Sequence, residues 1–173
     1  RELTKALLKD EKPAYIRVGR NAVDPTYEED NVPFEMDHAT VVTEGNTNGN
    51  DVAIIACGEM VKPAKDAARL LKAEGISASV LDMYCIKPID AELIEKCAKE
   101  TGAVVTAEEH SVIGGLGGAV SEVLAKAGCA VPTEMVGMQD RHGESGPYKD
   151  ILHKYGMDAE AVAAAAEKAV SRK

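Results

Sequence analysis

A continuous apolar run decides the fold that this sequence predicts: Val52-Ala53-Ile54-Ile55-Ala56-Cys57. A strand that faces water on one side alternates apolar and polar residues, whereas a strand covered on both faces is apolar throughout. A helical pattern follows over about 60–74, and Gly75 stands in the usual place of a C-terminal cap. The run therefore predicts a buried strand that leads into a helix.

The same alternation of strand and helix continues to the end of the chain. Strands are predicted at 76–83, 103–107 and 131–136, and helices at 91–100, 117–127, 147–155 and 158–171. Such alternation is typical of a parallel sheet with helices on both faces. Right-handed crossovers make this sheet doubly wound. The predicted class is therefore a three-layer α/β fold.

One further strand is predicted before the apolar run, at 39–43, with a polar turn at 45–50 between the two. A parallel crossover needs about a dozen residues, so these strands must be antiparallel if they are neighbours. We therefore expect a five-stranded, mostly parallel sheet with one antiparallel strand.

The first 38 residues lack this pattern. They contain a helical stripe at 2–9, a short alternating strand at 14–18 and an acidic, proline-containing connector at 21–38. The sequence thus divides into residues 1–20, a linker at 21–38 and a domain at 39–173. The first residue is Arg1 and not Met, so we expect a piece of a longer chain.

Composition restricts the possible partners. The 173 residues include 20 Lys and Arg against 29 Asp and Glu, for a net charge of -9. Such a chain repels nucleic-acid phosphates and anionic membrane surfaces, so neither is expected as a partner. No apolar run approaches the roughly 20 residues of a membrane helix, and no signal peptide is recognisable. We expect a cytoplasmic protein.

The four cysteines do not form a recognised motif. They are Cys57, Cys85, Cys97 and Cys129. No pair forms C-x-x-C or a zinc-ribbon spacing. Buried, reduced thiols are the expected state, and a catalytic nucleophile or metal ligand is the alternative.

A glycine-rich turn, Gly114-Gly115-Leu116-Gly117-Gly118, lies between a strand and a helix, where dinucleotide-binding loops occur. The fingerprint fails, because Val120 stands where the third glycine should be and six residues separate the strand from the glycines. The preceding Glu108 and Glu109 would also repel a pyrophosphate at the helix N-terminus. We expect these glycines to allow close packing of the helix on the sheet or on a neighbouring subunit.

Two polar segments follow predicted strands, at the edge where doubly wound sheets bind ligands. Glu108-Glu109-His110 could transfer protons, but without a nucleophile or metal partner we expect a capping and interface cluster. The loop at 139–146 contains Asp140, His142 and Ser145, the residue types of a catalytic triad. Triad members usually come from separate loops, so a docking loop is the favoured interpretation.

Arg17 and Arg20 flank Val18-Gly19 at the end of the predicted strand 14–18. Arginines beside a glycine that exposes the backbone are suited to binding a phosphate. By composition alone, both are ordinary surface residues.

Five segments, in order, resemble the C-terminal part of transketolase. They are Pro-Ala-Tyr-Ile-Arg-Val-Gly-Arg (13–20), Asp-Val-Ala-Ile-Ile-Ala-Cys-Gly (51–58), Val-Leu-Asp-Met-Tyr-Cys-Ile-Lys-Pro-Ile-Asp (80–90), Val-Val-Thr-Ala-Glu-Glu-His-Ser-Val-Ile-Gly-Gly-Leu-Gly (104–117) and Glu-Ser-Gly-Pro-Tyr-Lys-Asp-Ile-Leu-His-Lys-Tyr-Gly-Met-Asp (144–158). The resemblance implies that 1–20 is the end of the pyrimidine-binding domain and that 39–173 is the C-terminal domain. It also suggests the second chain of a split transketolase.

The resemblance implies transfer of two-carbon ketol units between sugar phosphates in the pentose phosphate pathway, with thiamine diphosphate and a divalent metal, Mg or Ca. The residues that bind the cofactor and metal belong to the N-terminal region or subunit, so no cofactor or metal is expected in this chain and no catalytic residue is assigned to it. Arg20 matches the family's substrate-phosphate arginine, the last of Ile-Arg-x-x-Arg, and Arg17 has no assigned role. This fragment alone is expected to be inactive and to serve assembly, as part of a homodimer in the intact enzyme.

Other interpretations stay open at the level of sequence. The same domain occurs in deoxyxylulose phosphate synthase and in 2-oxo acid dehydrogenase beta subunits. A free-standing regulatory or oligomerisation module is a different class. The sugar substrates, any effector of the C-terminal domain and the roles of Glu108, Glu109, His110 and His142 are left undecided by the sequence.

Overall fold

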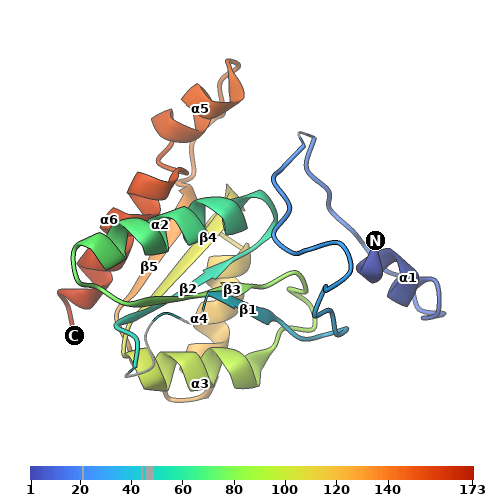
Figure 1. The fold of residues 1–173 in the computed structure, drawn as a ribbon, viewed down its shortest axis with the longest axis horizontal. Coiled ribbons are helices and arrows are strands. Elements are labelled where there is room, and N and C mark those ends of the chain that lie inside the picture. Colours follow the sequence, from blue (N-terminus) through green and yellow to red (C-terminus); the bar gives the residue numbers. More distant parts are fainter. Residues whose placement is uncertain (21, 44, 46–48) are drawn as a thin grey trace.

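The computed structural model describes residues 1–20, 22–43, 45 and 49–173. Its elements, labelled in Figure 1, are α1 (Glu2–Leu7), β1 (Thr40–Thr43), β2 (Val52–Ala56), the 3-10 turn η1 (Gly58–Met60), α2 (Val61–Ala73), β3 (Ala78–Asp82), α3 (Ala91–Thr101), β4 (Val104–Ser111), α4 (Leu116–Lys126), β5 (Thr133–Met138), α5 (Tyr148–Lys154) and α6 (Ala159–Val170). The predicted alternation is confirmed from β2 onward.

The five strands form one mixed sheet in the order β1-β3-β2-β4-β5. β2 pairs in parallel with β3 and β4, and β4 pairs in parallel with β5. β1 is antiparallel, as predicted, but its partner is β3 and not β2. β1 cannot pair with β2, because β3 and β4 already flank β2 on its two sides. It pairs instead with the outer side of β3.

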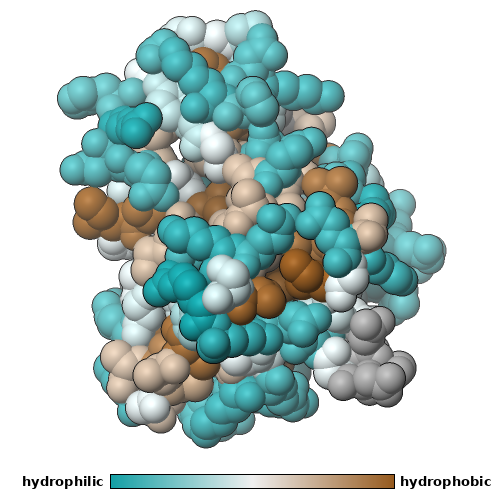
Figure 2. Space-filling model, turned by 90° about the vertical axis from the view of Figure 1, so that its left-hand side faces the viewer, coloured by the Kyte–Doolittle hydropathy of each residue, from teal (hydrophilic) through white to brown (hydrophobic). Residues whose placement is uncertain are grey.

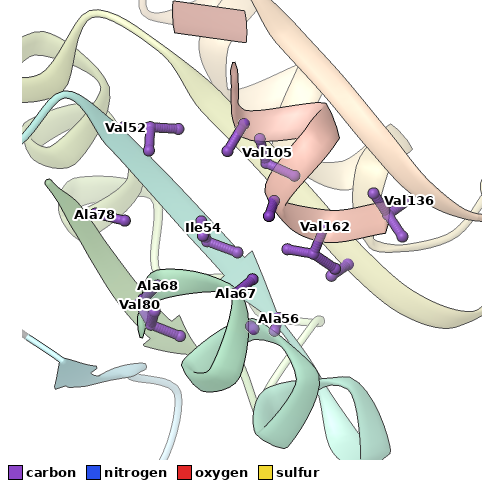
Figure 3. Close-up of a cluster of buried hydrophobic side chains, with 14 of the residues drawn as sticks. Val52, Ile54, Ala56, Ala67, Ala68, Ala78, Val80, Val105, Val136 and Val162 are labelled. Atoms are coloured by element: carbon purple, nitrogen blue, oxygen red, sulfur yellow. The ribbon is translucent and has the colours of Figure 1, made fainter. Parts of the chain in front are cut away.

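Helices cover both faces of the sheet, which confirms the three-layer, doubly wound architecture (Figure 1). On one face, α2 and α6 pack on alternate side chains of the strands, including Ile54, Val80 and Val105 (Figure 3). On the other face, α3 and α4 pack on Ile55 and Leu81. Every residue of β2 is buried, as expected for a central strand covered on both sides.

The surface contrasts with these two cores. Figure 2 shows the left-hand side of the molecule covered largely by hydrophilic residues, with hydrophobic residues in small groups between them. Among the described residues, no helix is both long enough and apolar enough to cross a membrane.

Residues at the ends of α3 and α6 cap these helices. Asp90 accepts a hydrogen bond from the backbone N–H of Leu93, 3.0 Å away, and begins α3. Gly102 ends α3 in the left-handed conformation, with φ of 69°. Asp158 caps α6 in the same way as Asp90 caps α3.

Two predictions for the first 50 residues need correction or fall outside the described residues. The segment 14–18 is not a strand: it is exposed and pairs with no other described segment. A strand requires hydrogen bonds to a neighbouring strand, and the described part of the chain offers none here. Residues 46–48 of the predicted turn and residue 21 of the connector lie outside the described residues.

The strand predicted at 103–107 is longer in the structure, because β4 continues to Ser111. Its pairing with β5 resumes after an irregularity, with Ser111 opposite Met138. Glu108, Glu109 and His110 are therefore part of the strand and do not follow it. Glu109 and His110 are tolerated in the strand because it leaves the core at this end, and burial decreases from Glu108 to His110.

Candidate functional site

The parallel strands β2, β4 and β5 end at the same edge of the sheet, which we call the carboxyl edge. Four side chains meet there and form what we call the carboxyl-edge cluster: Arg17, Glu59, Glu109 and Tyr148. They come from the N-terminal segment, η1, β4 and the start of α5. The fold thus collects residues from distant parts of the sequence at the edge where α/β sheets bind ligands.

Glu108 precedes Glu109 in β4 and is only 1 % exposed. Its two carboxylate oxygens accept hydrogen bonds from the backbone N–H groups of Leu116, at 2.7 Å, and Gly117, at 2.9 Å. These groups are unpaired donors at the N-terminus of α4, and a carboxylate there also interacts favourably with the helix dipole. The predicted capping role is confirmed for Glu108.

This cap explains the glycine-rich turn. A Cβ at Gly115 would lie 2.0 Å from Glu108 Oε2, and a Cβ at Gly117 would lie 2.7 Å from Met135 Sδ and 3.0 Å from Thr106 Oγ1. Gly117 therefore allows α4 to pack closely on the sheet, as predicted. Because the Glu108 carboxylate already occupies the helix N-terminus, this turn does not fit the diphosphate of a cofactor.

Glu109 binds the N-terminal segment. The Arg17 guanidinium donates a hydrogen bond to the Glu109 carbonyl oxygen at 2.9 Å and lies 3.6 Å from its carboxylate. Partial burial raises the pKa of Glu109, and the nearby Glu59 carboxylate raises it further, while Arg17 lowers it. Two acids and one arginine are therefore close enough to affect one another's ionisation.

Glu59 links the N-terminal segment to α5. Its carboxylate accepts a hydrogen bond from the Tyr148 hydroxyl, and a Cβ placed on Gly19 would lie 1.7 Å from the other carboxylate oxygen. Burial, followed by the hydrogen bond to Glu59, raises the pKa of Tyr148, so the phenol keeps its proton and remains a donor. Gly19 thus lets the backbone pass directly over the Glu59 carboxylate.

Arg20 follows this contact and is exposed. No hydrogen bond or ion pair connects its guanidinium to another described residue, so the side chain is available to a ligand. The structure therefore brings Arg17 and Arg20 to the same edge of the sheet, with Arg17 engaged and Arg20 available.

The other candidates do not combine into a site. His110 Nδ1 lies 3.8 Å from Glu108 Oε2, and its ring faces solvent. Asp140, His142 and Ser145 are all exposed, and no hydrogen bond joins any two of them in the described part of the chain. The carbonyl oxygen of His142 accepts a hydrogen bond from Tyr155, which ties the loop to the end of α5.

The cysteines are free thiols, as predicted, but only Cys97 is fully buried, and the other three are partly exposed. Cys57 lies closest to the carboxyl edge. Burial and the Glu108 carboxylate raise its pKa to about 12, so it carries no thiolate at neutral pH.

The sequence did not identify a hydrogen-bonded pair, Tyr27 and Asp82. At the end of β3, Asp82 is 8 % exposed and accepts a hydrogen bond from the Tyr27 hydroxyl at 2.8 Å. Burial raises the pKa of Asp82, and the Tyr27 hydrogen bond lowers it in part. Asp82 and Glu59 share one signal that could have identified them: a carboxylate at or just after the end of a predicted parallel strand.

The fold and its carboxyl edge define a doubly wound α/β domain with an antiparallel edge strand. Residues 41–162, more than half of the chain, match the family model described as "Transketolase, C-terminal domain". The chain therefore belongs to this family.

Known proteins support the assignment. The chain is 42% identical over 162 residues to one subunit of the apulose-4-phosphate transketolase of Phocaeicola vulgatus, covering 94% of this chain and 50% of that protein. A solved structure described as "Split gene transketolase, inactive beta4 tetramer" is 48% identical, with a TM-score of 0.90, covering 98% of this chain and 54% of that one. The chain thus spans about half the length of these relatives.

A second group of relatives matches a shorter part. The chain is 45% identical over 120 residues to 1-deoxy-D-xylulose-5-phosphate synthase 1 of Geobacter sulfurreducens, covering 69% of this chain and 19% of that protein. The likeness to the apulose-4-phosphate transketolase extends into the N-terminal segment that carries Arg17 and Arg20, because it covers 94% of the chain.

Proposed function

We propose that this chain is the C-terminal part of a thiamine-diphosphate-dependent transketolase, which acts together with an N-terminal transketolase region or subunit. The observation that carries this proposal is the likeness to a split-gene transketolase over 98% of the chain, with a TM-score of 0.90. Residues 1–20 are then the end of the pyrimidine-binding domain, 21–38 the linker and 39–173 the C-terminal domain.

The proposed reaction is the transfer of a two-carbon ketol unit between sugar phosphates in the cytoplasm. Thiamine diphosphate, with Mg or Ca, would be bound by the N-terminal part and would supply the carbanion chemistry. In this chain, the N-terminus of α4, where a diphosphate could bind, is occupied by the Glu108 carboxylate. This chain contributes the assembly surface of a homodimer and one substrate contact, Arg20.

Arg20 binds the phosphate of the sugar substrate in this proposal. A hydrogen bond to a charged group contributes about 1.5–3 kcal/mol, which corresponds to a roughly tenfold to 150-fold change in binding. In the assembled enzyme, Arg20→Ala should lower kcat/KM for a phosphorylated sugar by that factor and hardly change it for an unphosphorylated one. Arg20→Lys should recover part of the loss, because an ammonium keeps the charge but not the planar fork.

The comparison of the two substrates tests this role. An equal fall of kcat/KM for both would mean that Arg20 supports the fold or the assembly and does not bind phosphate. Arg141→Ala, an exposed arginine on the loop after β5, is a matched control for the loss of one positive charge.

A second experiment tests whether cofactor binding belongs to the N-terminal part and not to this chain. Calorimetry of the isolated chain with thiamine diphosphate and Mg should give no binding in the micromolar range, and a ketol-transfer assay should give no activity. Adding the N-terminal partner should restore both. Micromolar cofactor binding by the isolated chain would overturn the proposed division.

Synthesis of 1-deoxy-D-xylulose 5-phosphate is the second candidate, favoured by the 45% identity over 120 residues to a synthase of this product. We favour transketolase because the match to the apulose-4-phosphate transketolase covers 94% of the chain, whereas the match to the synthase covers 69%. The assembled enzyme should therefore transfer ketol units and form no deoxyxylulose phosphate, which product analysis distinguishes directly.

A further inference from the structure

The segment that carries Arg20 lies against the carboxyl edge at two positions, Arg17 and Gly19. Arg17 donates to the carbonyl oxygen of Glu109 at 2.9 Å, across 92 positions of sequence. Two residues later, the backbone of Gly19 passes so close to Glu59 that a Cβ would overlap the carboxylate, at 1.7 Å. These two contacts fix the path of the chain immediately before Arg20.

Glu59 cannot move away without cost. Its second carboxylate oxygen is bound by the Tyr148 hydroxyl at the start of α5, and Glu109 lies near enough for the two acids to affect each other. Arg17 lies beside Glu109, with its guanidinium 3.6 Å from the Glu109 carboxylate. The carboxyl-edge cluster is therefore a small charged network that fastens one backbone segment to the sheet.

The geometry points to Arg17, Gly19 and Glu59 as positioning residues for Arg20: they place its guanidinium for the substrate phosphate and do not touch the substrate. This inference rests on the proposed phosphate-binding role of Arg20. It gives Arg17 a role and explains why a glycine stands at position 19, where φ is not in the left-handed region that would by itself require one. The requirement at position 19 is space above the Glu59 carboxylate.

The main test is a double-mutant cycle between positions 19 and 59 in the assembled enzyme. Gly19→Ala should lower kcat/KM for a phosphorylated sugar roughly tenfold to a hundredfold, because a displacement of about 1 Å at a binding group has effects of that size. In a Glu59→Ala background the added methyl meets no carboxylate, so Gly19→Ala should then cost less than about threefold. An unphosphorylated sugar should show little change throughout, because it does not use Arg20.

Variants of Arg17 test the positioning role independently of the double-mutant cycle. Arg17→Ala should reduce kcat/KM for the phosphorylated sugar and spare the unphosphorylated one, and Arg17→Lys should restore part of the loss, since an ammonium can reach the Glu109 carbonyl with one hydrogen bond. Gly143→Ala is the matched glycine control, because a Cβ there meets no described atom within 4 Å and the residue lies on an exposed loop.

The outcomes separate this inference from the proposed function. Loss of phosphate discrimination in Arg20→Ala together with a Gly19→Ala effect that Glu59→Ala suppresses supports both. Loss in Arg20→Ala with no effect of Gly19→Ala or Arg17→Ala overturns the positioning role alone. Additive effects at positions 19 and 59, or equal losses for both sugars, also overturn it. If the Arg20→Ala enzyme still distinguishes phosphorylated from unphosphorylated sugars as the original enzyme does, the phosphate-binding role of Arg20 is overturned and this inference with it.

Discussion

At the scale of single residues, Glu108 shows how one side chain fixes a strand, a turn and a helix together. Its buried carboxylate joins the end of β4 to the first N–H groups of α4, eight and nine residues further along the chain. Gly115 is required beside it because a Cβ would lie 2.0 Å from the carboxylate. The acid that first suggested proton transfer is thus part of the framework.

Removing this cap should destabilise the domain. Glu108→Ala leaves the N–H groups of Leu116 and Gly117 buried without an acceptor, and a hydrogen bond to a charged group contributes about 1.5–3 kcal/mol. Urea denaturation should show a loss of unfolding free energy of at least that size. Glu122→Ala, on the exposed face of α4, should change it by less than about 0.5 kcal/mol. Equal losses in the two variants would refute the capping role.

The raised pKa of Asp82 predicts that the unfolding free energy of the domain depends on pH. Burial raises its pKa in the folded state, so the protonated acid is favoured by the fold. The stability that it contributes is present at low pH and is lost as the pH rises from about 4 through the raised pKa. Asp82→Asn removes this titration and keeps an oxygen for the Tyr27 hydroxyl.

The measurement for Asp82 is the unfolding free energy of both proteins between about pH 4 and pH 8. The variant should gain stability relative to the original protein as the pH rises, by a difference that grows through the raised pKa and then levels off. A difference that stays constant over this range would show that Asp82 does not titrate with a raised pKa.

At the scale of elements, the packing of α4 on the sheet depends on Gly117. Alanine at an open helical position is more favourable than glycine by up to about 1 kcal/mol, so Gly118→Ala, where a Cβ meets nothing within 4 Å, should stabilise the domain. Gly117→Ala should instead destabilise it by about 1–3 kcal/mol, because the methyl group overlaps Met135 and Thr106.

Thermal unfolding of the two variants is the check, since both changes are chemically identical and adjacent. Opposite shifts of Tm are expected, downward for Gly117→Ala and upward for Gly118→Ala. A rise of Tm in both would mean that α4 can move away from the sheet without penalty.

At the scale of the whole molecule, the two parts of the chain differ in how they are held. Residues 52–56 hydrogen-bond to strands on both sides, whereas Tyr15 and Val18 are 89% and 80% exposed on a segment with no strand partner among the described residues. In Figure 1 the beginning of this N-terminal part, with α1, lies away from the sheet and its helices. We therefore expect 39–173 to unfold as one cooperative unit without the N-terminal segment.

Amide hydrogen exchange on the isolated chain measures this difference. Backbone amides of β2 should exchange only through global unfolding, and those of residues 2–18 should exchange orders of magnitude faster. Addition of the proposed N-terminal partner should slow exchange in 14–18, because these residues then gain a neighbouring strand. Equal protection of 2–18 and β2 in the isolated chain would show that the domain boundary is misplaced.

The amino-acid sequence by itself determined the order of strands and helices, the buried character of β2 and the caps at Asp90 and Gly102, because these depend on residues within one or two turns of one another. Only the tertiary structure decided that β1 pairs with β3, that Glu108 turns inward to α4, and that Arg17 meets Glu109. These contacts depend on which strand ends become neighbours, a property of the strand order that local periodicity does not specify. The segment 14–18 follows the same principle, since its alternating pattern favours a strand and a strand forms only where a partner supplies the other half of its hydrogen bonds.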